Sequence, residues 1–284
     1  MLIKRLINNN MTVTDIDGEE AIVCGRGIGY AKKVGDAIPR EKVEHVYRMQ
    51  DPSHIKYLQE LIKDTPLEDV LLADTLTSYV KEHYSKPVNE TLLIVIMDHV
   101  NAARARHANG MDLVNPMLYD IQNIYCEEFG ISLRLLDIIE ERTGMRLPED
   151  EAGFLALNIV NAQLGTDMGR VVDITEFVHR VLDVVRSHFE ISTDPNSVYY
   201  RRFLTHLKYL ASRILDGTQP VGGIMNRFAI MHEINDAYPE AYEALDDVDG
   251  LIKSAYGRKL DGDERLYLLV HIVTLLKAGE QGTR

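Results

Sequence analysis

Two stretches of the chain have nearly the same sequence, and this internal repeat restricts the fold more than any other feature. DEAGFLALNIV at 150–160 and DERLYLLVHIV at 263–273 share an acidic start, a central leucine and a final Ile-Val. A shift of 113 residues extends the match to Gly144/Gly257, Leu147/Leu260, Asp150/Asp263, Glu151/Glu264, Leu155/Leu268, Ile159/Ile272 and Val160/Val273. A shift of 107 aligns 97–106 with 204–213. Loop-length differences would change the shift in this way, so the sequence predicts two homologous modules, at 65–170 and 171–284.

Both modules are expected to be all-α. Helical periodicity runs from Pro52 nearly to the end, and it is broken at SKPVN, GMDLVNPM, GMRLPED, STDPNS, DGTQPVGG and AYPEAY. Thr65-Pro66-Leu67-Glu68 predicts a capping box with proline at the first helical position. Asp173 with Glu176 predicts a similar cap where the second helical module begins.

The first fifty residues have the pattern of strands and turns. TVTDI alternates, Asp17-Gly18 is typical of a two-residue hairpin turn, and EEAIVC resumes extended structure. The following GRGIGYAKKVGD has too many glycines for a helix. We therefore expect a small antiparallel sheet to about residue 50, within a domain at 1–56. A sheet this small usually needs a packing partner, and dimerisation is the simplest source of one.

Composition excludes several classes of protein. No apolar run approaches the roughly 18 residues of a membrane span, and MLIKRLINNNMTVT lacks the apolar core and cleavage site of a secretory signal. Cys24 and Cys126 form no C-x-x-C, so neither a disulfide framework nor a thiolate metal site is indicated. We expect a cytoplasmic protein with no membrane insertion, metal or cofactor.

Charge is distributed unevenly along the chain. Residues 1–50 hold 8 Lys/Arg and 7 Asp/Glu, a net charge of +1. Subtraction from the totals of 31 and 44 leaves 23 against 37, a net charge of −14, for the other residues. An acidic body repels nucleic acid, so any contact with a phosphate backbone should come from the first fifty residues.

The glycine-rich stretch at 24–30, CGRGIGY, has three interpretations. It completes neither G-x-G-x-x-G nor G-K-[ST], which disfavours a nucleotide loop. A tight turn with a bulge between strands is the plain alternative. Together with INNN at 7–10, however, it offers amides for base edges, Arg26 for paired hydrogen bonds and Tyr30 for stacking. Phosphate contacts are expected from Lys4, Arg5, Lys32 and Lys33. Few cations on a nearly neutral sheet favour a small, shape-specific RNA site.

Histidines occupy equivalent positions in the two repeats. The first module has His99 and Asn158 where the second has His206 and His271, and the histidines lie on or beside apolar helical faces. A single such histidine is most often a packed one, but three at equivalent positions favour a function. Without H-E-x-x-H or an i, i+4 pair, a metal site is disfavoured.

A neutral imidazole can accept a phosphoryl group. The resulting dianion on a packed face would recruit cationic partners or drive the packed faces apart. The histidines therefore indicate a switch rather than an enzyme.

These motifs resemble those of the BglG/LicT-type transcriptional antiterminators. INNN…GRGIGYAKKVGD resembles the co-antiterminator RNA-binding domain of that family. The two helical modules resemble its paired phosphotransferase-system regulation domains (PRDs), through DHVNAARAR, PEDEAGFLAL, RFLTHLKYL and DERLYLLVHIV. The resemblance covers essentially the full chain. It implies a dimeric domain that binds an RNA hairpin overlapping a terminator, so that transcription continues into sugar-utilisation genes.

The resemblance also implies control by histidine phosphorylation. The sugar-specific transporter (enzyme II) would inhibit through PRD1 at His99, and the phosphocarrier HPr would activate through PRD2 at His206 and His271. Asn158 stands where the family pattern has a second PRD1 histidine. Because a carboxamide cannot accept a phosphoryl group, we expect any inhibition to act through His99 alone. The implied RNA-site residues are Asn10, Gly25, Arg26, Gly27 and Tyr30, the last commonly phenylalanine in the family.

Two other functions stay open. A PRD-type DNA-binding activator would need a DNA-binding element, and the N-terminal residues show no helix-turn-helix pattern. A purely structural helical protein with incidental histidines would not need the paired repeat.

Overall fold

The structure is a computed structural model that describes residues 1–189, 197–218 and 227–282. It divides into two compact units. The first comprises Met1–Leu118 with Glu127–Thr166, and the second comprises Tyr119–Cys126 with the chain from Asp167 onward. The predicted break at STDPNS lies outside the described residues except for Ser197, as does most of DGTQPVGG.

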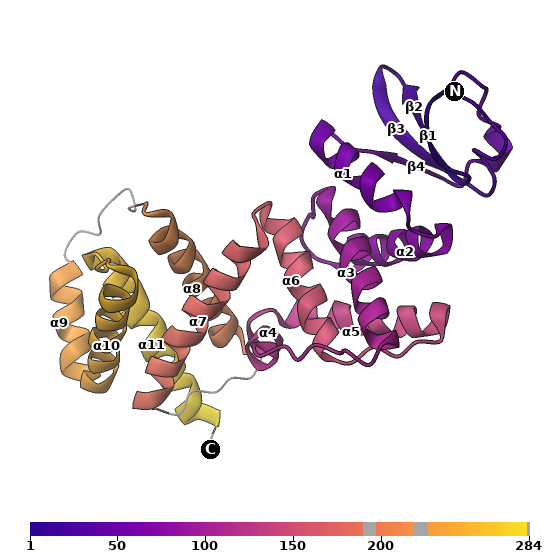
Figure 1. Ribbon diagram of the computed structural model, residues 1–284. Coiled ribbons are helices and arrows are strands. Elements are labelled where there is room, and N and C mark those ends of the chain that lie inside the picture. Colours follow the sequence, from indigo (N-terminus) through magenta and orange to yellow (C-terminus); the bar gives the residue numbers. More distant parts are fainter. Residues whose placement is uncertain (190–196, 219–226, 283–284) are drawn as a thin grey trace. The chain divides into compact units, whose positions relative to one another are not determined.

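A four-stranded antiparallel sheet opens the first unit, as predicted (Figure 1). Its strands follow chain order: β1 (Ile3–Asn8), β2 (Met11–Ile16), β3 (Glu19–Cys24) and β4 (His45–Arg48). Ile16 pairs with Glu19 across the β2–β3 turn, and Asp17 and Gly18 between them have φ of 60° and 91°. Two successive positive φ angles define the type of turn that Asp-Gly favours in hairpins.

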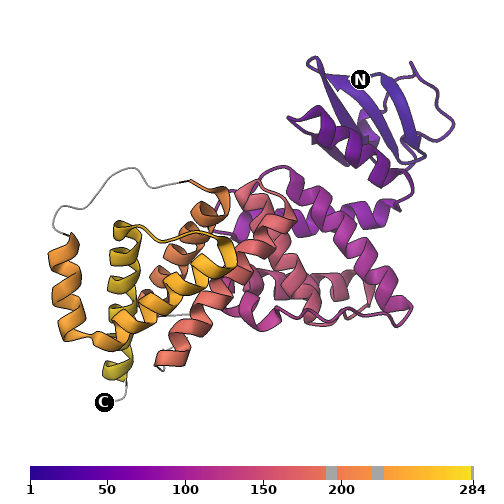
Figure 2. The same cartoon turned by 60° about the vertical axis from the view of Figure 1, so that its left-hand side comes forward.

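Both faces of the sheet are covered by the chain itself. On one face, Met11, Val13 and Ile22 are fully buried in a cluster that includes residues of α1 (Pro52–Lys63) and of the next two helices. On the other face, Val23 packs with Ile28 from the segment after β3. Figure 2 shows α1 lying against the sheet. Because the sheet has packing partners in its own chain, its small size is no longer an argument for dimerisation.

The predicted capping box at Thr65 is wrong. Helix α2 (Leu67–His83) starts close to the expected place, but Pro66 is its N-cap and no side chain caps it. The Thr65 hydroxyl instead donates to the carbonyl oxygen of Leu61, at 2.7 Å, in the last turn of α1. Because the two helices are so close in sequence, the Thr65 hydroxyl bonds to a carbonyl oxygen at the end of α1 instead of capping the start of α2.

Glu90 joins the sheet-and-α1 part of the unit to helix α3 (Thr91–Ala108). Its carboxylate accepts the backbone N–H groups of Gln50 and Asp51, at 2.6 and 3.1 Å, just before α1. His54 Nδ1 lies 2.8 Å from the same carboxylate. Although partial burial opposes ionisation, the two N–H groups and His54 outweigh it and hold the pKa of Glu90 below its usual value.

Replacing Glu90 with glutamine should lower the free energy of unfolding at pH 7 by about 1–2 kcal/mol, because charge-assisted hydrogen bonds become neutral ones. The lowered pKa means that the ionised group stabilises the fold above the unfolded-state pKa and stops doing so as the pH falls through the folded one. Denaturant unfolding at pH 7 and near pH 3 should therefore show a smaller difference between variant and wild type at the lower pH. Glu240→Gln, at an exposed carboxylate in the first turn of α10 (Pro239–Tyr256), is the matched control. An equal loss in both variants would contradict the proposed link.

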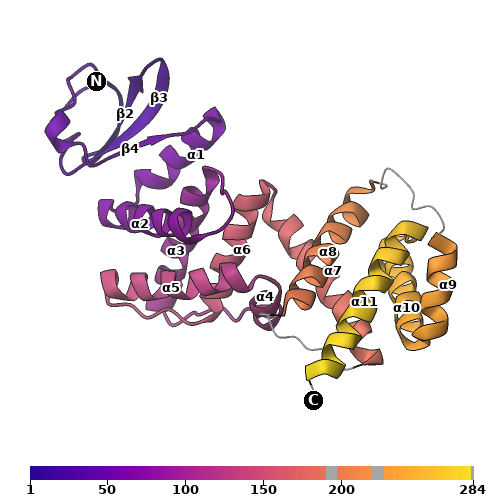
Figure 3. The same cartoon turned by 180° about the vertical axis from the view of Figure 1, so that it is seen from behind.

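The helices of the two modules repeat in order. After α2 and α3 the first module continues with α4 (Leu118–Ile124), α5 (Cys126–Thr143) and α6 (Asp150–Leu164). The second module contains α7 (Met168–His188), α8 (Val198–Asp216), α9 (Arg227–Ala237), α10 and α11 (Gly262–Gly282). The 107 shift relates α3 to α8, and the 113 shift relates α5–α6 to α10–α11. Gly144 and Gly257 have left-handed φ of 70° and 66° after α5 and α10, as glycines that end helices commonly do. Figure 3 shows α7, α8, α10 and α11 of the second unit, where α11 packs on α8 and α10.

The predicted cap at Asp173 is also wrong. Helix α7 begins at Met168, and Asp167 caps it by accepting the Arg170 N–H at 3.0 Å. Asp173 and Glu176 lie inside the helix, one turn or more beyond its start. In the part of the chain that the structure describes, no helix has the length and apolar character needed to cross a membrane.

Candidate functional site

The glycine-rich segment after β3 is tied by backbone hydrogen bonds to the β1–β2 turn. The Gly25 N–H donates to the Asn10 carbonyl oxygen at 2.9 Å, and the Gly29 N–H donates to that of Asn9 at 3.0 Å. The Asn10 side chain adds a third bond, because its Oδ1 accepts the Gly27 N–H at 2.8 Å. The two segments therefore form one rigid surface at this end of the sheet.

Close backbone approach explains two of the glycines. A Cβ on Gly25 would lie 1.7 Å from the Lys42 carbonyl oxygen, and one on Gly29 would lie 2.6 Å from that of Asn8. Gly27 has space around it but has a φ of 63°, which favours glycine. The plain interpretation of a tight turn with a bulge is only partly correct, because the glycines lie in turns at the start of a long connection from β3 to β4. The side chains of this segment remain to be assigned.

Ile28 is buried against the sheet, whereas Arg26 and Tyr30 point to solvent. The Arg26 side chain is 81% exposed and Tyr30 is 69% exposed. Lys32 is half-buried, and its backbone N–H donates to the Gly29 carbonyl oxygen at 3.2 Å. A guanidinium, a phenol ring and an amine held on one rigid loop can contact phosphates and stack on unpaired bases.

The structure gathers six of the predicted RNA-site residues. Asn10, Gly25, Arg26, Gly27, Tyr30 and Lys32 lie on the loop and turn just described. Lys4 lies near the opposite end of β1, where its Nζ donates to Asp15 at 2.9 Å. The ion pair with Asp15 raises the pKa of Lys4.

Sequence reasoning missed two residues that organise this loop. Asn8 Oδ1 accepts the Asn10 N–H at 2.9 Å, while Asn8 Nδ2 donates to the Ile62 carbonyl oxygen at 3.2 Å, at the end of α1. Glu44 accepts the Arg26 N–H at 3.1 Å. Asn8 belongs to the INNN motif, whose pattern alone suggests amides that contact base edges rather than amides that bond to the backbone.

In the first helical module, His99 lies on α3 beside a buried carboxylate. Its Nε2 is 2.7 Å from Glu151 Oε2 on α6, and Arg106 Nη2 is 3.1 Å from the other oxygen of Glu151. Burial alone would raise the pKa of Glu151, but His99 and Arg106 outweigh it and lower that pKa. Asn158, also on α6, is buried.

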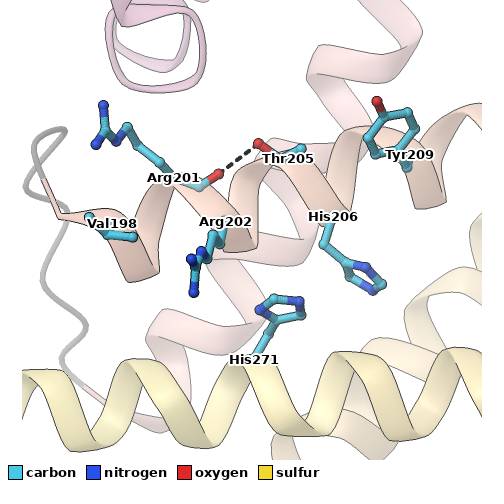
Figure 4. Close-up of a pocket in the computed structure, with 7 residues that line it drawn as sticks. All are labelled: Val198, Arg201, Arg202, Thr205, His206, Tyr209 and His271. Atoms are coloured by element: carbon cyan, nitrogen blue, oxygen red, sulfur yellow. Dashed lines mark hydrogen bonds between the residues drawn. The ribbon is translucent and has the colours of Figure 1, made fainter.

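In the second module, His206 on α8 and His271 on α11 face each other, with ring centroids 4.9 Å apart. They line a surface groove of about 410 Å³ together with Val198, Arg201, Arg202, Thr205 and Tyr209. Figure 4 shows Arg202 extending from α8 toward His271, whereas Arg201 and Tyr209 point away from α11. A cation and two imidazoles are thus assembled at one open site.

Burial keeps both of these histidines neutral near pH 7. It lowers the pKa of His206 to about 4, with His271 and Arg213 contributing in the same direction. Burial and Arg202 also lower the pKa of His271. A neutral ring has a nitrogen lone pair, so both histidines are in the nucleophilic state at physiological pH.

The two modules share a buried ion pair at equivalent positions. Arg213 Nη2 lies 3.2 Å from Glu264 Oε1, and both residues are the repeat partners of Arg106 and Glu151. An aromatic ring also recurs, with Phe154 beside His99 and Tyr267 beside His206. The predicted repeat is therefore present in the interior contacts as well as in the sequence.

Comparison with known protein families matches residues 1–56 to the CAT RNA binding domain and residues 74–162 and 179–275 to the PRD domain. The chain belongs to the family of PRD-containing transcription antiterminators. It is 34% identical to the transcription antiterminator LicT of Bacillus subtilis (strain 168), over 98% of this chain and 99% of LicT. It is also 34% identical to the beta-glucoside operon antiterminator of Dickeya chrysanthemi, over 96% of this chain and 95% of that protein. The crystal structure of GlcT CAT-PRDI has 29% identity and a TM-score of 0.49, over 57% of this chain and 97% of that one.

The glycine loop lies in the matched CAT domain. His99 and Asn158 lie in the first matched PRD (PRD1), and His206 and His271 lie in the second (PRD2). The relatives are regulators of transcription rather than enzymes. Among the residues that the structure describes, no three His, Cys, Asp or Glu side chains are grouped as metal ligands would be.

Proposed function

We propose that this antiterminator binds an RNA hairpin through its CAT domain, allows transcription of sugar-utilisation genes, and is controlled by phosphorylation of its PRD histidines. One observation carries the proposal: this chain combines a CAT domain with two PRDs and aligns along nearly its full length with two antiterminators. The exposed Arg26 and Tyr30 supply the RNA contacts. The protein acts in the cytoplasm as a homodimer and as a regulator rather than an enzyme. The domain limits 1–56, 65–170 and 171–284 are part of the same proposal.

Phosphorylation controls the two PRDs in opposite directions. HPr transfers phosphoryl groups to His206 and His271, whose open groove and neutral rings support an acceptor role. The modified PRD2 then closes as a dimer that brings two CAT domains onto one hairpin. The sugar-specific transporter domain inhibits through His99, since Asn158 cannot accept a phosphoryl group.

A gel shift tests the nucleic-acid assignment. The full chain should be used, because a fragment ending at residue 56 would cut α1 and remove part of the core that it shares with the sheet. We expect the chain to bind a short RNA hairpin more tightly than duplex DNA of the same sequence, and Arg26→Ala to weaken RNA binding by about tenfold or more. Equal or tighter binding of duplex DNA would replace this proposal with a DNA-binding activator.

A further inference from the structure

The environment of His99 distinguishes its two ring nitrogens. Nε2 is buried and lies 2.7 Å from Glu151 Oε2. The carboxylate oxygen stands off the direction of the ring N–H, so the two groups are in close electrostatic contact without a linear hydrogen bond. Glu151 is itself buried and is held in place by Arg106. The His99 side chain as a whole is 18% exposed, so part of it is open to solvent.

A phosphoryl group cannot reach Nε2 in this arrangement. The space beside that nitrogen is filled by the carboxylate, and a phosphoryl dianion there would face the negative charge of Glu151 at close range in a poorly solvated site. The nearby negative charge would also repel a lone pair on Nε2 and attracts an N–H there, so the neutral ring carries its proton on Nε2. The lone pair that can attack a phosphorus atom is then on Nδ1.

We propose that His99 accepts its phosphoryl group on Nδ1 and that Glu151 is the positioning residue that directs it there. This inference rests on the proposed function, because it assumes that His99 is an acceptor. The Nδ1 lone pair forms the new N–P bond as the donor protein's bond to phosphorus breaks, and the electron pair of the broken bond returns to the donor atom. The Nε2 proton stays in place, so no proton is transferred and the ring becomes an imidazolium beside the Glu151 carboxylate.

Glu151 has two effects in this step. Before transfer it holds the ring in one tautomer and one orientation. During transfer its negative charge stabilises the imidazolium that forms. A carboxylate beside the far nitrogen of a reacting histidine performs the same tasks in the catalytic triad of serine proteases.

PRD2 provides an internal comparison. Glu264 occupies the position equivalent to Glu151 and pairs with Arg213, but within the described residues no ion pair joins it to His206. The His206 ring lies against His271 instead. Burial raises the pKa of Glu264, whereas that of Glu151 is lowered. The same buried carboxylate thus has a histidine partner only in PRD1, where the second acceptor position is Asn158.

The test reads the position of the phosphoryl group on the ring. The full chain, labelled with ¹⁵N-histidine, is treated with potassium phosphoramidate, which needs no donor protein. Long-range ¹H–¹⁵N spectra at alkaline pH identify the modified nitrogen, and His99→Gln assigns the signals. We expect Nδ1-phosphohistidine at residue 99 in an excess of about tenfold or more, because a buried charge beside Nε2 disfavours the other product by at least about 1.4 kcal/mol. A main product on Nε2, or no label at His99 when His206 is labelled, would overturn the proposal.

Two variants separate positioning from folding. Glu151→Gln keeps the size of the side chain but removes its charge, and it should slow phosphorylation of His99 by about 10-fold to 100-fold and abolish the Nδ1 preference. Glu264→Gln disturbs the equivalent arginine pair and should leave the product at His99 unchanged. If Glu151→Gln also keeps a pure Nδ1 product at the wild-type rate, Glu151 has no positioning role.

A parallel reaction with the phosphorylated transporter domain tests the proposed function separately. Labelling of His99 by the transporter domain supports that function whichever nitrogen is modified. If only phosphoramidate labels His99, on Nδ1, the inference about the ring holds and the inhibitory role of His99 fails.

Discussion

Replacing Gly25 with alanine is expected to destabilise the CAT domain by about 3 kcal/mol and to lower RNA affinity by about 100-fold. The new Cβ would lie 1.7 Å from the Lys42 carbonyl oxygen, and backbone atoms cannot move aside as the end of a flexible side chain can. The loop must therefore move, which separates Gly25 from Asn10 and displaces Arg26. Thermal unfolding and hairpin titration of the full chain measure the two effects.

A glycine elsewhere in the chain provides the control. Gly130 lies inside α5, and a Cβ there meets nothing within 4 Å. Gly130→Ala should raise stability by about 0.5–1 kcal/mol through helix propensity and leave RNA affinity unchanged. Wild-type RNA affinity in Gly25→Ala would show that the rigid loop is not the RNA-binding surface.

Replacing His206 and His271 together with alanine should remove the response to HPr. In the wild type, phosphorylation by HPr should raise hairpin affinity and dimer content by about 10-fold to 100-fold, the usual range for coupled sites. The double variant loses both acceptor nitrogens in the groove and should show neither increase. Sedimentation and hairpin titration, each with and without phosphorylated HPr, measure these quantities.

His232→Ala is the control for the double variant. His232 is an exposed histidine on α9 that pairs with Asp236 and does not line the groove. This variant should respond to HPr as the wild type does. A full response in the double variant would place the activating site elsewhere in the chain.

Local sequence patterns predicted the elements whose determinants are close together in the chain. Asp17-Gly18 specified its hairpin turn, and the repeat identified equivalent helices because glycines and acidic pairs recur at helix ends. Helix α1 was not predicted as a separate helix, although Asp51 followed by Pro52 is a strong start signal, and Asp51 does accept the Ser53 N–H at 2.7 Å. The Thr65 and Asp173 caps failed because several polar residues near each helix start could serve as the cap.

Contacts between distant residues explain most of what the sequence could not predict. The six gathered residues of the RNA loop all lie between Asn10 and Lys32, and their grouping followed from the hairpin. By contrast, Asn8 bonds to a residue 54 positions away and Glu90 to one 40 positions away, and no spacing rule connects them. The histidine positions could be predicted from the repeat, but the carboxylate beside His99 required the packing of α3 against α6.

Helix α1 is held at both ends by residues from different parts of the first unit. Glu90, at the start of the helix that carries His99, binds the backbone just before α1. Asn8 binds the last turn of α1 and also the turn that supports the RNA loop. A continuous series of hydrogen bonds and one helix therefore connects the start of α3 with the RNA surface.

Such a connection has to act in both directions. If modification of PRD1 weakens RNA binding by a given factor through α1, bound RNA must disfavour that modified state by the same factor. An antiterminator already bound to its hairpin would then resist inhibition by PRD1 phosphorylation, and the RNA-free protein would be modified first.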